Sequence, residues 1–245
     1  MKSAHKLLDL AAVRAFLSLI FPEKCPLCGK GNPADGSPDM FCKECLDTMQ
    51  FVKGSPCPVC GGDINGIFEI CPDCLAEPQR KWVRGYSVFR YTNGAAAAVR
   101  RYKYGNEIAL AKPFGKLLAG VINSPEQYAE IIPVPLHWIR FLQRGYNQSL
   151  LLSLELSKWT GIPAVSRLRR VRNTKHQAFL EREDRLKNIR GAFRVRKPEQ
   201  IAGKRVLLID DVMTTGSTLS ECAAILTEAG AVVDIAVIAR RQSRL

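Results

Sequence analysis

Apolar residues occur in short continuous runs in some segments and at helical spacing in others, which together predict a mixed α/β protein. The short continuous apolar run at 206–209 is rich in β-forming residues and is typical of a central parallel strand covered on both faces. Strands are predicted at 85–92, 130–135, 162–165 and 206–209, helices at 94–105, 108–122, 146–161 and 219–230, and a charged turn at 136–145. This alternation fits right-handed β-α-β crossovers, in which ligands bind at the carboxyl ends of the strands.

Residues 1–22 are predicted to form an amphipathic helix that packs against the body of the protein. Leu7, Leu10, Val13, Leu17 and Ile20 fall at helical spacing. Charged residues interrupt the apolar stretch, which argues against a signal peptide. The chain nowhere has about 18 continuous apolar residues, so we expect no membrane span and a cytoplasmic protein.

The stretch 205–218 predicts a phosphate-binding turn. Asp210 and Asp211 are expected to end the strand, and residues 214–218 supply hydroxyls, a glycine and the amides of a helix N-terminus, which attract a phosphate. The spacing fits neither a P-loop nor a GxGxxG dinucleotide motif. Two carboxylates can accept hydrogen bonds from sugar hydroxyls while the turn holds a phosphate on the same sugar, which suggests a 5-phosphorylated ribose. The alternative is a capped strand-to-helix turn with no ligand.

Eight of the nine cysteines form four CxxC pairs, and this pattern predicts structural zinc. The pairs are Cys25 with Cys28, Cys42 with Cys45, Cys57 with Cys60, and Cys71 with Cys74. Gaps of 13 and 10 residues separate the paired knuckles, so sequential pairing gives two sites of four thiolates with no open catalytic position. Interleaved pairing of the first and last knuckles, and a disulfide framework, are the alternatives. Cys222 is expected in the core.

Composition and charge divide the chain further. The 245 residues allow one large or two smaller domains. The composition changes after Pro78, which predicts a double zinc ribbon over 23–78 and an α/β domain over 79–245. The formal charge is +13, and residues 166–205 hold 14 Lys and Arg against 4 Asp and Glu. Such a balance favours anionic ligands or nucleic acid.

Five sequence blocks together resemble the ComF family, which includes competence protein F and GntX-like proteins. The stretch DDVMTTGST at 210–218 resembles the binding signature for phosphoribosyl pyrophosphate (PRPP) in type I phosphoribosyltransferases. The blocks RYKYG at 101–105, IIPVPLHWIRFLQRGYNQS at 131–149 and RVRNTKHQAFLEREDRLKNIRGAF at 170–193 stand in the family's order. The double CxxC ribbon is also similar to that family, so the resemblance covers essentially the whole chain.

This resemblance implies a type I phosphoribosyltransferase-like fold, an α/β parallel sheet with flanking helices and a small hood behind the cysteine-rich ribbon. It assigns PRPP binding to Asp210, Asp211, Thr214, Thr215, Gly216, Ser217 and Thr218, and catalysis to Asp210, Asp211 and Arg144. It assigns pyrophosphate to the turn Val134, Pro135, Leu136 and His137, and to a mobile loop at 172–188 with Arg172, Lys175, His176, Gln177, Arg182 and Arg185. Some of these charges are expected to be solvated surface groups only.

The resemblance also implies Mg²⁺ with PRPP and a link to natural transformation. Two functions stay open on the sequence. The first is a Mg²⁺-dependent phosphoribosyltransferase that releases pyrophosphate and acts on an unidentified acceptor. The second is a non-catalytic PRPP-binding accessory protein that binds single-stranded DNA, or a DNA-uptake or recombination protein. Purine phosphoribosyltransferases carry an acid where this chain has Thr214, so the turn offers no obvious general base.

Overall fold

The computed structural model describes residues 24–30, 40–64, 69–172 and 189–242. Contacts divide the chain into two compact units, residues 1–47 and 48–245. The predicted helix over residues 1–22 lies outside the described residues. The domain boundaries predicted at 22 and 78 stay a prediction. The first unit contains the short helix α2 (Lys43–Asp47) and the first four cysteines.

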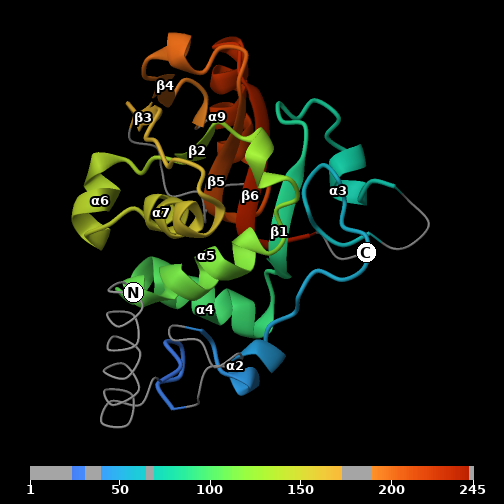
Figure 1. The fold of residues 1–245 in the computed structure, drawn as a ribbon, viewed down its shortest axis with the longest axis vertical. Coiled ribbons are helices and arrows are strands. Elements are labelled where there is room, and N and C mark those ends of the chain that lie inside the picture. The colour runs from blue at the N-terminus through green and yellow to red at the C-terminus, as the bar shows by residue number, and fades with distance from the viewer. Residues whose placement is uncertain (1–23, 31–39, 65–68, 173–188, 243–245) are drawn as a thin grey trace, which may run out of the picture. The chain divides into compact units, whose positions relative to one another are not determined.

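The second unit is built on a four-stranded parallel sheet (Figure 1). Its strands lie in the order β1 (Gly85–Arg90), β6 (Val232–Arg240), β5 (Arg205–Met213) and β2 (Glu130–Pro133). The two central strands are nine residues long and almost wholly buried, as expected for parallel strands covered on both faces.

Helices cover both faces of the sheet, and a hairpin adds to one of them. On one side lie α5 (Ala111–Ala119) and α7 (Gln148–Thr160), near α4 (Asn93–Tyr104) (Figure 1). Helix α9 (Ser217–Glu228) packs on β5, β6 and β4 (Phe193–Val195), which pairs antiparallel with β3 (Leu168–Arg170). The remaining short elements are α3 (Pro72–Leu75), α6 (Trp138–Arg144) and 3-10 turns at Ile108–Leu110, Pro125–Gln127 and Pro198–Gln200.

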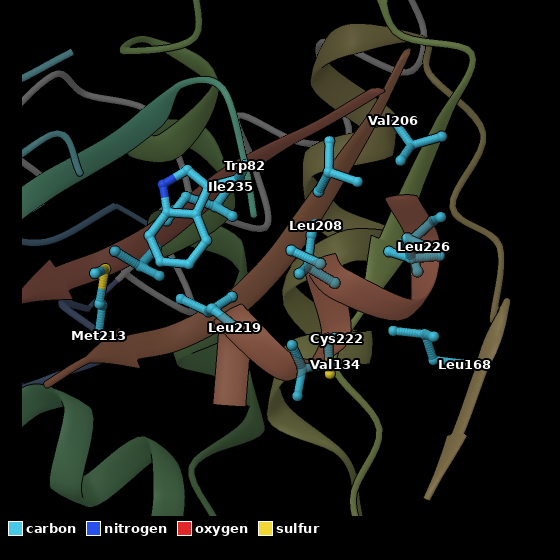
Figure 2. Close-up of a cluster of buried hydrophobic side chains, with 14 of the residues drawn as sticks. Trp82, Val134, Leu168, Val206, Leu208, Met213, Leu219, Cys222, Leu226 and Ile235 are labelled. Atoms are coloured by element: carbon cyan, nitrogen blue, oxygen red, sulfur yellow. The ribbon is translucent and has the colours of Figure 1, made fainter. Parts of the chain in front are cut away.

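Strand alternation sends the side chains of β5 into two cores. Val206 and Leu208 join Cys222 and Leu226 of α9 in one buried cluster (Figure 2). Leu207 is also fully buried, and alternation directs it to the opposite face of the sheet. Each such side chain stabilises the fold by about 1.5 to 3 kcal/mol through burial. The expectation that Cys222 is a core residue is confirmed.

Three predicted elements differ in the structure. The charged turn predicted at 136–145 is wrong, because 138–144 form helix α6, which His137 caps through its Nδ1 and Gly145 ends at φ 78°. Strand β5 does not stop before the acidic pair but continues to Met213, because β6 offers it a partner as far as Arg240. The strand predicted at 162–165 is reduced to one parallel bridge between Ile131 and Ala164.

Within the described residues, every helix is too short or too polar to cross a lipid bilayer.

Candidate functional site

A tight turn connects β5 to α9 and carries the predicted phosphate-binding residues. Gly216 adopts φ 81° at the N-terminus of the helix. The positive φ favours glycine, and a Cβ there would lie 2.8 Å from Cε of Met213, so any other residue would also require this methyl to shift. The hydroxyls of Thr215 and Ser217 lie 2.7 Å apart beside the first amides of α9. The Ser217 amide donates to the Thr215 hydroxyl at 3.4 Å, and residues 214–218 all line one cavity, so the turn offers donors of the kind that bind an anion.

A cavity of about 330 Å³ lies at the carboxyl ends of β5 and β2. Its lining contains these predicted residues: Val134, Pro135, Leu136, Arg144, Asp210, Asp211, Thr214, Thr215, Gly216, Ser217 and Thr218. The two turns are adjacent because β2 pairs with β5, and the amide of Val134 donates to the carbonyl of Ile209 at 2.9 Å. Asn147, the N-cap of α7, also donates to the Val134 carbonyl, at 3.1 Å. The strand order therefore brings the predicted sugar-phosphate and pyrophosphate turns together.

Asp210 is held at the floor of this cavity. Its Oδ1 accepts hydrogen bonds from the Ser149 hydroxyl and from the Asp211 amide, both at 2.9 Å. Burial, with repulsion from Asp211, raises the pKa of Asp210 to about 7. The attraction of Lys103 and the two hydrogen bonds oppose this rise. A ligand that brings positive charge or hydroxyl donors would therefore stabilise the charged form of this carboxylate.

Lys103, near the end of α4, supplies a cation to the acidic pair. Its Nζ lies 2.9 Å from Oδ1 of Asp211, and both side chains are largely buried. Burial disfavours the charge on Lys103, but attraction by Asp211 and Asp210 outweighs it, so the pKa of Lys103 is raised.

Three of the four arginines in the described cavity lining come from α6 and β3. Arg140 and Arg144 lie on α6 and Arg170 ends β3. Burial and the neighbouring charge of Arg140 lower the pKa of Arg170 to about 10, and burial and Arg144 lower the pKa of Arg140. The guanidinium of Arg144 stacks on Tyr104 at 4.7 Å. Such crowded cations make a strongly positive wall that favours a polyanionic ligand.

The cysteines form two tetrads in sequential pairs. In each tetrad, Cys25, Cys28, Cys42, Cys45 and Cys57, Cys60, Cys71, Cys74, all four sulfurs lie within 4.8 Å of one another. The Sγ atoms of Cys28 and Cys42 are 3.7 Å apart, and those of Cys60 and Cys71 are 3.6 Å apart. These separations are far too long for disulfides and match the roughly 3.8 Å edge of a tetrahedron with Zn–S bonds of about 2.3 Å.

One backbone amide of the second tetrad donates to a ligand sulfur. The amide of Cys71 donates to the sulfur of Cys57 at 3.5 Å. Both tetrads fit structural zinc with every position filled by protein, and the predicted sequential pairing is confirmed.

Sequence comparison assigns the chain to a family. The double zinc ribbon domain matches residues 16–75, and the phosphoribosyl transferase domain matches residues 155–245. The chain is 31% identical over 195 residues to Competence protein F of Haemophilus influenzae, covering 76% of this chain and 85% of that protein. The chain belongs to the ComF family. It is also 33% identical to DNA utilization protein YhgH of Salmonella typhi, over 78% of this chain and 86% of that protein.

The parallel sheet of this ComF protein is phosphoribosyltransferase-like, as predicted, because the phosphoribosyl transferase domain matches residues 155–245, which include β5 and β6. Among solved structures, the glutamine PRPP amidotransferase of B. subtilis complexed with ADP and GMP matches with a TM-score of 0.40 and 23% identity. That match covers 56% of this chain and 30% of the amidotransferase chain.

Two predicted pyrophosphate residues lie away from the cavity lining. His137 is buried and caps α6, where its Nδ1 accepts from the Ile139 amide at 3.4 Å. Burial and the charges of Arg170 and Arg140 lower the pKa of His137. Arg172 is exposed and donates to the carbonyl of Arg190 at 2.9 Å. Lys175, His176, Gln177, Arg182 and Arg185 lie outside the described residues.

The structure also brings residues to the cavity that sequence reasoning did not single out. They are Tyr91, Lys103, Tyr104, Arg140, Gln148, Ser149, Arg170, Val212, Met213, Leu219 and Arg241. Lys103 and Tyr104 stand within the ComF block RYKYG, and Ser149 ends the block that starts at Ile131. These blocks are the sequence signal that could have identified the residues, because their polar side chains have no place in a predicted core.

Proposed function

We propose that the cavity binds PRPP with Mg²⁺ and that the protein transfers phosphoribosyl to an unidentified acceptor with release of pyrophosphate. One observation carries this proposal. Two adjacent carboxylates and a threonine-rich helix N-terminus share a cavity of about 330 Å³ with Lys103, Arg140, Arg144 and Arg170. PRPP has the matching arrangement of hydroxyls, one terminal phosphate and a pyrophosphate.

The turn at 214–218 is proposed to hold the 5-phosphate. Its hydroxyls and the first amides of α9 are donors, and the helix dipole favours the negative charge. Asp210 and Asp211 would accept hydrogen bonds from the ribose hydroxyls. Their negative charge would also stabilise the cationic sugar that develops as the C1 bond breaks.

The pyrophosphate is proposed to lie against Arg140, Arg144 and Arg170. Charge accumulates on this leaving group, and guanidinium groups stabilise it by short, paired hydrogen bonds. When bound, Mg²⁺ would neutralise pyrophosphate oxygens, and Asp210 and Asp211 are the carboxylates of the described lining that could ligate it. The residues of the chain would bind PRPP, orient its ribose and neutralise its pyrophosphate.

The biological setting is proposed from the relatives. Similar proteins are named for competence and for DNA utilization, so we infer a role linked to DNA uptake. We place it in the cytoplasm, where reduced thiols remain available as zinc ligands.

The test of PRPP binding is calorimetry on the double variant Asp210→Asn with Asp211→Asn. We expect wild type to bind PRPP in the presence of Mg²⁺ and the variant to lose binding while retaining about two zinc ions per chain. A control with the same charge change is Glu126→Gln with Glu199→Gln, two exposed acids that do not line the cavity. Equal affinity in all three proteins would refute the proposal.

A non-catalytic accessory role is the second candidate. In the described part of the lining, Asp210 and Asp211 are the sole carboxylates, and both have the sugar or Mg²⁺ as their proposed partner. A third carboxylate that could serve as general base for the acceptor is therefore absent from that lining. Pyrophosphate release, assayed with PRPP, Mg²⁺ and candidate acceptors, separates the two roles. Binding without turnover, together with steeply salt-dependent binding of single-stranded DNA, would favour the accessory role.

A further inference from the structure

The second cysteine tetrad is part of the same buried cluster as the phosphate-binding turn. Cys57, Cys60, Cys71 and Cys74 pack in one core with Met213 and Leu219, which flank the turn at 214–218. Figure 2 shows Trp82 in this cluster together with Met213 and Leu219. A metal site and a ligand site that share a core can affect each other through side-chain contacts.

Arg240 links residues 71–74, the CPDC knuckle of the second tetrad, to the phosphate-binding turn. It is 2% exposed at the end of β6, and its guanidinium lies 2.8 Å from Oδ2 of Asp73, the residue just before the ligand Cys74. The same guanidinium donates to the Thr214 carbonyl at 2.5 Å and to the Met213 carbonyl at 3.4 Å. One buried cation therefore links an acid inside a metal knuckle to the backbone of the phosphate turn.

Trp82 links residues 57–60, the CPVC knuckle of the second tetrad, to the same turn. The indole Nε1 donates to the carbonyl of Val59, which lies between the ligands Cys57 and Cys60, at 2.6 Å. The far edge of the indole lies 3.4 Å from the position of a Cβ on Gly216. Arg80 stacks on this indole at 5.0 Å and donates to the Asp73 carbonyl at 3.4 Å. In each knuckle, a residue between the two cysteines is therefore linked to the turn: Asp73 through Arg240, and Val59 through Trp82.

We propose that the second metal site positions the phosphate-binding turn, with Asp73 and Arg240 as positioning residues. A zinc ion folds its knuckles, and only a folded CPDC knuckle keeps Asp73 against Arg240. Loss of metal or of the ion pair releases the carbonyls of Met213 and Thr214 and loosens the turn. The first tetrad belongs to the other compact unit and serves as the internal control. The consequence for PRPP affinity rests on the proposed function, whereas the change in the turn does not.

The decisive variant is Asp73→Asn, because it removes the ion pair and keeps all four thiolates. We expect two zinc ions per chain, amide hydrogen exchange in residues 213–218 that is faster by about tenfold, and PRPP affinity that is weaker by about the same factor. Exchange in β2 should not change. Asp47→Asn is the matched control, since Asp47 is an exposed acid two residues after Cys45 of the first tetrad and takes no part in the Arg240 ion pair.

Metal removal is tested with Cys71→Ser beside Cys42→Ser, one ligand from each tetrad. Faster exchange at 213–218 in Cys71→Ser alone supports the proposal, and equal exchange in both variants overturns it. If Cys71→Ser fails to fold, Asp73→Asn decides the question, and unchanged exchange there overturns the proposal. If wild type does not bind PRPP, the proposed function fails, but the exchange data still judge the coupling.

Discussion

Lys103 and Asp211 form a largely buried ion pair, 2.9 Å from Nζ to Oδ1, although 107 positions separate them along the chain. The pair joins the end of α4 to β5 at the edge of the cavity. Its charge lowers the cost of placing two carboxylates side by side, because attraction by Lys103 opposes the rise in the pKa of Asp210. The acidic pair therefore depends on a cation from a distant helix.

We expect Lys103→Met to destabilise the protein. The variant leaves adjacent buried carboxylates without this cation, so the free energy of unfolding at pH 8 should fall by about 2 kcal/mol. Lys158→Met is the control, because Lys158 pairs with Glu155 at 2.7 Å on the surface and should cost less than about 0.5 kcal/mol. Urea unfolding measures both values, and a similar loss in the two variants would contradict the structural role of Lys103.

The role of Lys103 shows where sequence reasoning stopped. The residue pattern at 94–105 predicts the helix that carries it, and the order of residues at 210–218 predicts the acidic pair and the glycine turn. The acidic pair and the turn lie near Lys103, Ser149 and Arg170 only because of the strand order and the helices that cover the sheet. Single-sequence patterns record neighbours along the chain, so a site assembled from α4, α6, α7 and β5 is only partly visible in them.

Helix α6 and strand β5 show the same limit at the level of local structure. Trp138, Phe141 and Leu142 are exposed on α6, so its apolar residues follow no core-facing period and the segment resembled a turn. Asp210 ended the apolar run of β5, yet the strand continues because Asp210 pairs in register with Val237 of β6. The length of β5 is therefore determined by its pairing with β6, the strand that follows α9.

We expect Asp210→Asn to stabilise the ligand-free protein in a pH-dependent way. The pKa of Asp210 is about 7 in the folded protein and 3.8 in the unfolded reference, so folding favours its protonated form. That contribution is fully present below pH 3.8 and is lost as the pH rises through 7. An amide avoids this loss, so the variant should gain about 1 kcal/mol at pH 8 and little at pH 4.

Urea unfolding of both proteins at pH 4, 6 and 8 checks this expectation. The gain should grow steadily with pH, and PRPP binding should be lost in the same variant. A variant that is less stable than wild type at pH 8 would show that the carboxylate is not disfavoured by its site.

We expect Arg140→Gln to weaken binding of inorganic pyrophosphate without loss of stability. Arg140 lines the cavity together with Arg144 and Arg170, and burial and repulsion from Arg144 lower its pKa, so its removal relieves repulsion in the ligand-free site. The affinity should fall about tenfold, since one charged hydrogen-bonding group is removed from the proposed anion site. Calorimetry gives the affinity and urea unfolding gives the stability. Arg100→Gln, an exposed arginine on α4 away from the cavity lining, should change neither.

Gly216→Ala is expected to damage the phosphate-binding turn more than its backbone angle alone requires. Gly216 and Gly203 both have positive φ, 81° and 72°, so alanine should strain each by about 1 kcal/mol. A Cβ at 203 meets open space, whereas a Cβ at 216 would lie 2.8 Å from Cε of Met213 and 3.4 Å from Trp82. The buried terminal methyl of Met213 must then shift within the core beneath the turn. Gly216→Ala should therefore lower the free energy of unfolding more than Gly203→Ala and weaken PRPP binding at least tenfold, by roughly 1.4 kcal/mol. Equal stability losses, with PRPP affinity intact in both variants, would mean that the turn tolerates displacement and does not grip the phosphate.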